Sequence, residues 1–488
     1  MSSSKQQEIL APILPRVIGQ RDIDIREDTD FVTRAILLSW SLIDISGQSS
    51  EKLSDRATMS SSNIRDKDEA LKDWVSRLPD DILVNIISRL TLKEAARTSV
   101  LSSRWKYLWT YASNLNFDAS KLLVNVYEET LEEERLRYMC WVNKVLESHK
   151  GLSVNEFIIV FDLDDSHESN ISHWVYTAIS KRAQKFELNL FPALCWPPAS
   201  GIYEFSQGCY DYLKSPCGLS SVKSLRFLYF DTVNVTEEIL EFFINNCPNL
   251  DDLRVGRSDN LLRLKVVGSL LQLKCLHIDH CNNLEELEIS CPSLLSFKYF
   301  GPEIKLHVKN VPQLVDVLIG GGHGIGKGKV IGPIVNYFPQ LKTLELHVEL
   351  NEEILQFPEC DLPELRHLMF MVSALDCSSL LGLTCMMKSC PLLQKLTFKL
   401  EIFHYSAEII MRHQIPKHSH QCLKVLEFVG FSGDPVELEL AYYMFENATM
   451  LEEMIVEPSE YEPEAQAARK SAKKLEKMLP PGVKLVFH

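Results

Sequence analysis

Residues 73–111 read DWVSRLPDDILVNIISRLTLKEAARTSVLSSRWKYLWTY, and the interpretation of the whole chain starts from them. Apolar residues recur at separations of three and four, the spacing of one helix face: Leu78, Ile82, Leu83, Ile86, Ile87 and Leu90. Thr91 stands three residues before Glu94, a capping box that predicts a second helix over Leu92–Thr98. A third helical pattern runs from Ser102 to Trp109. Because about forty residues cannot bury so many apolar side chains internally, we expect a surface that is completed by a partner.

The order of these residues resembles an F-box. The resemblance rests on LPDDIL at 78–83, on the aliphatic and alanine positions that follow, and on TSVLSSRWKYLW at 98–109. It implies a three-helix module that binds a Skp-type adaptor and joins a cullin-based ubiquitin ligase through it. The adaptor-binding residues that it implies are Leu78, Pro79, Ile82, Leu83, Ile86, Leu90, Val100, Leu101, Trp105 and Trp109.

Two of these positions carry an open alternative, because Trp105 and Trp109 can also be plain core of the module. For Leu78, Pro79, Ile82 and Leu83 we favour adaptor contact, since proline sets the entry of the first helix and the aliphatic residues form an anchor cluster typical of interfaces. Changing both Leu78 and Pro79 to alanine is expected to abolish adaptor binding.

Composition excludes several classes of protein. The chain has 488 residues, a formal net charge of −15 and a pI near 5.5, which disfavours nucleic acid as a partner. Its 13 cysteines are dispersed without a CxxC pair, as expected of buried reduced thiols rather than of a zinc site. No basic and apolar leader is visible, and the apolar run Ala35–Ile45 is interrupted by polar residues. We therefore expect no membrane span and a cytosolic or nuclear location.

The predicted organisation is α/β, with four parts. Residues 1–70 are expected to form a disordered tail, and residues before Met59 to be dispensable. The F-box is placed at 71–113, an irregular leucine-rich repeat solenoid at 114–415, and a C-terminal cap at 416–488. Before the repeats become regular, helices are predicted at 128–147 and 171–183, and strands at 157–163 and 186–190. The first of these helices is expected to bury Leu131, Leu136, Met139, Val142 and Leu146.

A leucine motif recurs from Leu225 onward and resembles an irregular leucine-rich repeat. Its units open at Leu225, Leu250, Leu273, Leu284, Leu294, Leu314, Leu341, Leu365, Leu393, Leu423 and Leu451. One unit cannot bury its own apolar face, so neighbouring units share a core. The separations of 11 and 10 residues around Leu284 leave no room for a helix and predict extended turns there. Residues 235–246 and 375–389 have room for helices.

The C-terminal residues resemble an FBD domain, a module of plant F-box/leucine-rich repeat proteins. Asp434, Pro435 and Glu437 predict a capped helix start, and Leu438, Ala441, Phe445 and Ala448 are its expected inner stripe. A last helix over 464–479 and a last strand over 483–487 complete the cap, which closes the end of the solenoid.

Catalytic signals are absent from the pattern. The run GGGHGIGKGK at 320–329 approaches a phosphate loop, but Gly328 replaces the hydroxyl residue that binds the metal. His277, His280, His418 and His420 have no ligand partners at metal-binding spacing. We therefore predict no cofactor, no metal and no enzymatic activity.

The resemblance implies a substrate-recognition subunit of an SCF-type (Skp–cullin–F-box) E3 ubiquitin ligase, which binds an unknown target protein through its repeat and FBD-like regions. A ligase-independent scaffold is the alternative. A small-molecule receptor is disfavoured, because such a site needs a basic cluster, whereas the expected middle strand positions are mixed or acidic, as at Asp251, Glu285 and Glu286.

Overall fold

The computed structural model describes residues 78–124, 126–193, 198, 201–321, 338–349, 361–374, 379–402, 419–459 and 462–488. The described residues do not include the predicted tail at 1–70 with Met59. They also do not include His418 or most of the glycine-rich run. The chain forms two compact units. The first comprises residues up to Leu163 with Ser169–Glu187 and Pro192–Trp196, and the second comprises the remainder.

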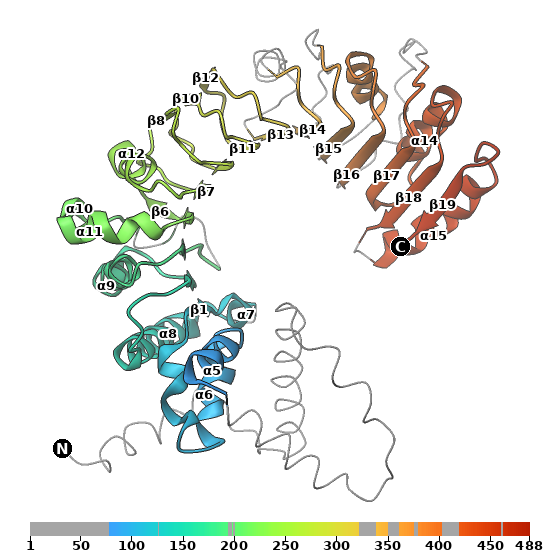
Figure 1. Ribbon diagram of the computed structural model, residues 1–488. Helices are drawn as coiled ribbons and strands as arrows, with labels where there is room; N and C mark the ends of the chain where they lie inside the picture. Colours follow the sequence, from blue (N-terminus) through green and yellow to red (C-terminus); the bar gives the residue numbers. More distant parts are fainter. Residues whose placement is uncertain are drawn as a thin grey trace, which may run out of the picture. The chain divides into compact units, whose positions relative to one another are not determined.

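The first unit begins with the predicted helical module (Figure 1). Its elements are α5 (Asp80–Ile87), α6 (Leu92–Arg97), and the 3-10 helices η2 (Thr98–Val100) and η3 (Trp105–Tyr111). The capping box is confirmed: the Glu94 N–H donates to Thr91 Oγ1 at 3.3 Å, and the Thr91 N–H donates to Glu94 Oε2 at 3.1 Å. The third helical pattern is a 3-10 helix.

A strand and helix layer follows in the same unit. Its elements are β1 (Asn114–Asp118), α7 (Ser120–Leu123), α8 (Glu128–Ser148), β2 (Glu156–Val160), α9 (Glu168–Ser180) and β3 (Lys185–Asn189), with strand order β1-β2-β3. The predicted helix at 128–147 is confirmed as α8, but the burial of Leu136 was wrong, since that side chain is 55% exposed. Tyr138 is buried instead, because it lies seven residues after Leu131 on the same helix face. Its hydroxyl donates to the Phe117 carbonyl at 2.7 Å.

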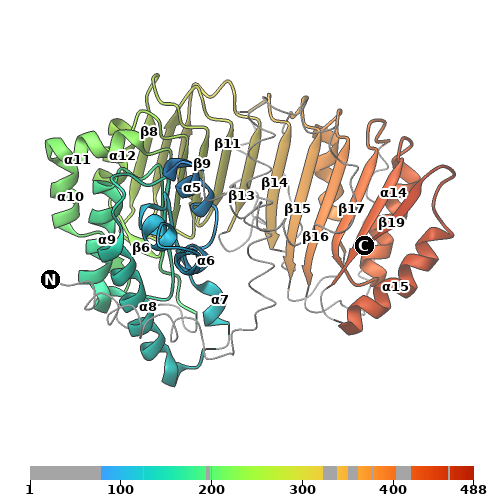
Figure 2. The ribbon, with the colours of Figure 1, turned by 60° about the horizontal axis from the view of Figure 1, so that its bottom comes forward.

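The second unit is built on a parallel sheet, here called the main sheet (Figure 2). Its strands in order are β5 (Phe227–Asp231), β7 (Asp252–Gly256), β9 (Cys275–Asp279), β11 (Ser296–Phe300), β13 (Asp316–Gly320), β14 (Thr343–Glu349), β15 (His367–Ala374), β16 (Lys395–Ile402), β17 (Val425–Phe431), β18 (Glu453–Pro458) and β19 (Lys484–Phe487). Every one of these strands except β19 begins two residues after the leucine that opens a predicted repeat. The repeat prediction is therefore confirmed for ten of its eleven units.

Alternation along the strands separates the two faces of the main sheet. Inward residues such as Leu368 and Phe370 are fully buried, while the residues between them are half-buried. Phe370, Phe398 and Phe428 stack from strand to strand, with successive ring centroids 5.6 Å apart. Neighbouring units therefore share one continuous core.

The unit that opens at Leu284 is the exception. Its strand β10 (Glu286–Ser290) pairs with β8 (Arg263–Val267) and β12 (Lys305–Val308) in a separate three-stranded sheet. Placing Leu284 in the same stack as the other units was therefore wrong. The 21 residues from Leu273 to Ser293 make one coil that carries a strand on each side. The predicted extended, helix-free turns are confirmed.

Other coils return through helices. These elements are η4 (Asp165–His167), β4 (Tyr203–Glu204), α10 (Gln207–Lys214), α11 (Pro216–Ser221), η5 (Val222–Ser224), β6 (Val233–Asn234), α12 (Glu237–Asn246) and η7 (Leu381–Ser389). The helices predicted at 235–246 and 375–389 correspond to α12 and η7. Helices and the β8–β10–β12 sheet lie on one side of the main sheet (Figure 1). The other side, which no described element of the second unit covers, is called the open face below.

The C-terminal elements are α14 (Pro435–Asn447), α15 (Glu462–Glu476) and the edge strand β19. The capping box of Asp434 and Glu437 is confirmed, and the fully buried Glu437 carboxylate also accepts from the N–H groups of Ser432 and Gly433. Leu438 and Phe445 are only half-buried, which corrects the predicted stripe. Leu440 and Met444 take the inner positions.

Candidate protein-binding surface of the helical module

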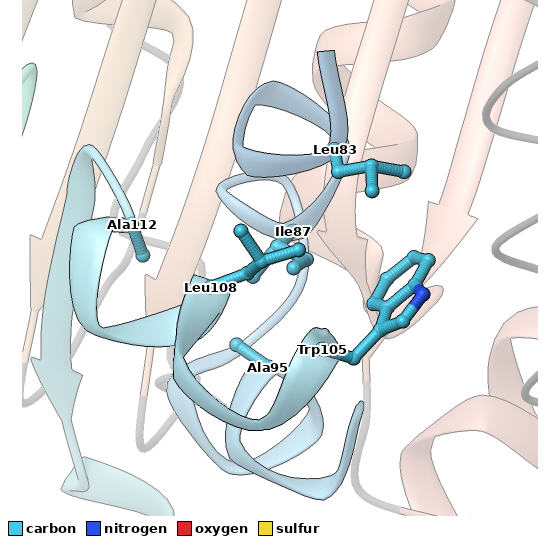
Figure 3. Packing of buried hydrophobic residues seen from close by; sticks show 6 residues of the cluster. All are labelled: Leu83, Ile87, Ala95, Trp105, Leu108 and Ala112. Atoms are coloured by element: carbon cyan, nitrogen blue, oxygen red, sulfur yellow. The ribbon is translucent and has the colours of Figure 1, made fainter. Parts of the chain in front are cut away.

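The helical module has a core of its own (Figure 3). The buried members are Leu83, Ile87, Ala95, Trp105, Leu108 and Ala112, and Leu78, Val84, Leu90 and Trp109 pack partly against them. The module is thus folded by contacts between α5, α6 and η3, although its core is small.

The structure divides the ten candidate residues into three groups. Leu83, Ile86 and Trp105 are buried; Leu78, Leu90 and Trp109 are half-buried; and Pro79, Ile82, Val100 and Leu101 are exposed. Direct contact with a partner is open to the exposed group, whereas the buried group supports it from beneath. Trp105 packs in the core of the module, as one of the two alternatives expected. Adaptor contact by these residues stays a prediction.

Three exposed side chains define what we call the apolar surface of the module. Ile82 is 42%, Val100 79% and Leu101 47% exposed. A soluble chain exposes single apolar residues routinely, but a group on one small module is typical of an interaction site.

Arg104 holds the start of α5 in place and was not among the candidate residues. Its Nε donates to Asp80 Oδ1 at 2.9 Å, and its Nη2 donates to the Leu78 carbonyl at 2.5 Å. This anchors the residues on either side of Pro79. The only sequence signal was the position of Arg104 within the SSRW part of the motif.

The module differs in charge from the chain as a whole. Residues 78–113 contain five basic and three acidic side chains, while the whole chain carries a net charge of −15. The basic residues are Arg89, Lys93, Arg97, Arg104 and Lys106. An apolar surface in a basic setting fits a partner with acidic residues around its apolar contact.

The open face of the main sheet also differs from expectation. Its middle positions on β7, β9 and β11 are Arg254, His277 and Lys298, whereas Glu286 lies on β10 in the other sheet. The earlier assignment of middle strand positions was therefore wrong. Arg254 is bound by Asp252 at 2.8 Å, and burial, the largest cause, lowers the pKa of His277 below its ordinary value. These three open-face positions consequently carry less positive charge than their residue types suggest.

Metal binding and thiol chemistry are two further possibilities for the described ranges. These residues contain no cluster of three or more His, Cys, Asp or Glu side chains placed to hold a metal ion. The cysteines among them are free thiols, and burial raises the pKa of Cys247 and Cys281 to about 12, which keeps both protonated and unreactive. Within the same ranges, no helix combines the length and apolar character needed to cross a bilayer.

Comparison with known proteins identifies both parts of the chain. The F-box domain model matches residues 75–116, and the model of the At1g61320/AtMIF1 leucine-rich repeat domain matches residues 145–484. The F-box/LRR-repeat protein At4g15060 of Arabidopsis thaliana is 29% identical over 357 residues, covering 68% of this chain and 80% of its own length. F-box/LRR-repeat protein 13 of the same plant is 24% identical over 434 residues, covering 80% and 91%.

A third relative bears on the C-terminal cap. The FBD-associated F-box protein At4g10400 of Arabidopsis thaliana is 29% identical over 348 residues, covering 64% of this chain and 80% of its own length. The leucine-rich repeat model extends over the residues assigned to the FBD-like cap. The boundary at residue 416 stays a prediction.

Proposed function

Because this chain belongs to the plant F-box/leucine-rich repeat proteins, with a repeat domain of the At1g61320/AtMIF1 family, we propose that it is the substrate-recognition subunit of an SCF-type E3 ubiquitin ligase. Its F-box binds a Skp-type adaptor and, through it, the cullin scaffold. Its repeat and FBD-like regions bind the target protein. The proposed location is the cytosol, the nucleus or both.

The observation that carries the proposal is the apolar surface of the module. Ile82, Val100 and Leu101 stay exposed although the module has formed its own core from Leu83, Trp105 and their neighbours. Burial of these side chains against an adaptor would contribute roughly 25 cal/mol for each Å² of apolar surface removed from water. The basic residues around them supply complementarity to an acidic partner.

Members of this family act in general without catalysing a reaction themselves, and ubiquitin transfer would take place in other subunits. The contribution of this chain is proximity: it holds the target beside the conjugating enzyme and raises its effective concentration. A ligase-independent scaffold would bind the same partners without causing their turnover. Measuring turnover of a captured target, with and without an intact F-box, separates the two.

The test compares two double variants of the full chain in adaptor binding. Val100→Asp with Leu101→Asp places two charges on the apolar surface and is expected to weaken adaptor binding by about 100-fold or more, since two exposed anchors would be lost. Leu152→Asp with Leu270→Asp is the matched control, because both leucines are exposed outside the module. Tryptophan emission, to which Trp105 and Trp109 contribute together with the other five tryptophans, checks that the fold is retained. Unchanged adaptor binding by the first variant would overturn the proposal.

A further inference from the structure

Among the glutamates of the open face, Glu345 has apolar residues beside it in register on both sides. Glu345 lies on β14, and the strand register places Leu318 of β13 on one side and Met369 of β15 on the other. Side chains at paired positions of a sheet point to the same face, and neighbouring strands lie about 4.8 Å apart. All three side chains are half-buried. A carboxylate is thus set between two apolar side chains.

This carboxylate has no hydrogen bond or ion pair to any residue that the structure describes. Charged neighbours act on it only from a distance, with Lys298 and Lys399 attracting it and Asp316 repelling it. Burial, the largest cause, raises the pKa of Glu345 above its ordinary value. Removing a carboxylate from water without a compensating donor is costly.

Two other strand glutamates of the same unit have side chains with donors beside them in register. Glu427 on β17 is bound by Lys395 Nζ at 2.8 Å and accepts from Thr397 Oγ1 at 2.8 Å. Glu288 on β10 lies in register between Lys265 and His307. Glu345 is therefore unlike them, because its neighbours in register provide no donor. A ligand that carries a hydrogen-bond donor could supply the partner that Glu345 lacks among the described residues.

The surroundings indicate which kind of group this is. A cation that reaches Glu345 would also contact Leu318, Met369 and Met371, which is the half-buried methionine two residues further along β15. Methionine side chains adapt to varied apolar partners. Desolvation on binding would strengthen the ion pair, since water would no longer screen it. Free anions and nucleic acid would be repelled at this position.

We propose that Glu345 is a specificity-determining residue of the target-binding site, and that it binds a lysine or arginine side chain of the target, next to an apolar target residue that packs on Leu318 or Met369. The inference rests on the proposed function, because it names the substrate class of that function. On the other side of Leu318, Lys298 lies in register and has no ion pair within the described ranges. It is available to an acidic residue of the same target segment.

The test uses a phage-displayed library of random peptides against the purified full chain. The wild type is expected to enrich peptides in which Lys or Arg adjoins an apolar residue. Glu345→Gln should weaken binding of those peptides by about tenfold or more, the size of one charge-assisted pair. Glu345→Lys should reverse the preference, so that acidic residues replace basic ones. Glu288→Gln, a strand-centre glutamate of the other sheet, is the matched control and should select the same peptides as the wild type.

Three outcomes would overturn the inference: no peptide selected by the wild type, no basic residue enriched, or the same selection by Glu345→Gln. Adaptor binding is measured on the same preparations. If the wild type does not bind the adaptor, the ligase proposal is contradicted. The peptide preference depends on the open face alone. The two failures are thereby distinguished.

Discussion

The F-box module and the main sheet contain the same kinds of apolar residue but bury them to different extents. In the main sheet, inward residues such as Leu344, Leu368 and Leu396 are fully buried, because each strand is covered by the next coil. In the module, Ile82 and Val100 remain exposed beside a core that is already formed. A repeat is thus completed by its own chain, while the module leaves apolar side chains exposed that the proposed adaptor would cover.

The largest effect is expected where the repeat core is continuous. Phe398→Ala removes the middle ring of the stack between Phe370 and Phe428, and should cost about 3–5 kcal/mol of unfolding free energy, because it removes apolar burial and leaves a cavity. Hydrogen exchange of peptides from β15–β17 measures this loss of unfolding free energy. Val425→Ala, at a half-buried open-face position, is the control and should cost about 1 kcal/mol or less. Equal effects of the two changes would contradict the two-faced description of the sheet.

Adjacent residues of α5 allow the same comparison inside the module. Leu83→Ala should destabilise the module by about 2–5 kcal/mol, because Leu83 is fully buried against its core. Ile82→Ala should change stability by less than about 1 kcal/mol and act on adaptor binding instead. Denaturant unfolding followed by tryptophan emission gives the first quantity, and adaptor titration gives the second. A loss of stability as large for Ile82→Ala as for Leu83→Ala would show that the module has no separate binding surface.

The junction between the module and the following layer predicts a dependence on pH. His149, at the end of α8, contacts the Ala112 carbonyl through Nε2 at 2.9 Å, and its Nδ1 has no hydrogen-bond partner among the residues that the structure describes. Burial, the largest cause, lowers the pKa of His149 from 6.5 to about 4. The neutral ring is therefore the form that the folded unit accommodates.

As the pH falls, His149 is protonated in the unfolded chain before it is protonated in the folded protein. The stability contributed by neutral His149 is complete above pH 6.5 and is lost as the pH falls from there toward 4. At pH 5 the loss should be about 2 kcal/mol. Tryptophan emission of the wild type and of His149→Gln, in denaturant at pH 7 and pH 5, measures it. The variant should show the smaller change, and identical changes in the two proteins would contradict the assignment.

Local signals explain what could be predicted. The Thr91 capping box and the strand starts two residues after each leucine depend on neighbouring residues, so the sequence carries them directly. The same local motif at Leu284 also starts a strand two residues later, but it cannot state which sheet that strand joins. That choice depends on pairing with β8 and β12.

The sequence could predict which residues belong to the candidate binding surface, but not which of them are buried and which are exposed. Ile82 and Leu83 are adjacent apolar residues, and only the packing of η3 against α5 determines which one is buried. Glu345 was missed for a related reason. Its isolation arises from Leu318 and Met369, which lie more than twenty residues away in the chain and meet it only through strand register.

The smallest predicted effect tests whether the module depends on its capping box as well as on its core. Thr91→Ala removes the hydroxyl that accepts the Glu94 N–H, and should cost about 1 kcal/mol, since the bond is exposed and water replaces part of it. Thr91→Ser retains the hydroxyl and is the matched control. Denaturant unfolding read by tryptophan emission resolves the difference. Because Thr91 lies outside the apolar surface, adaptor binding by the folded variant should stay unchanged; a loss of binding without a loss of stability would extend that surface to the start of α6.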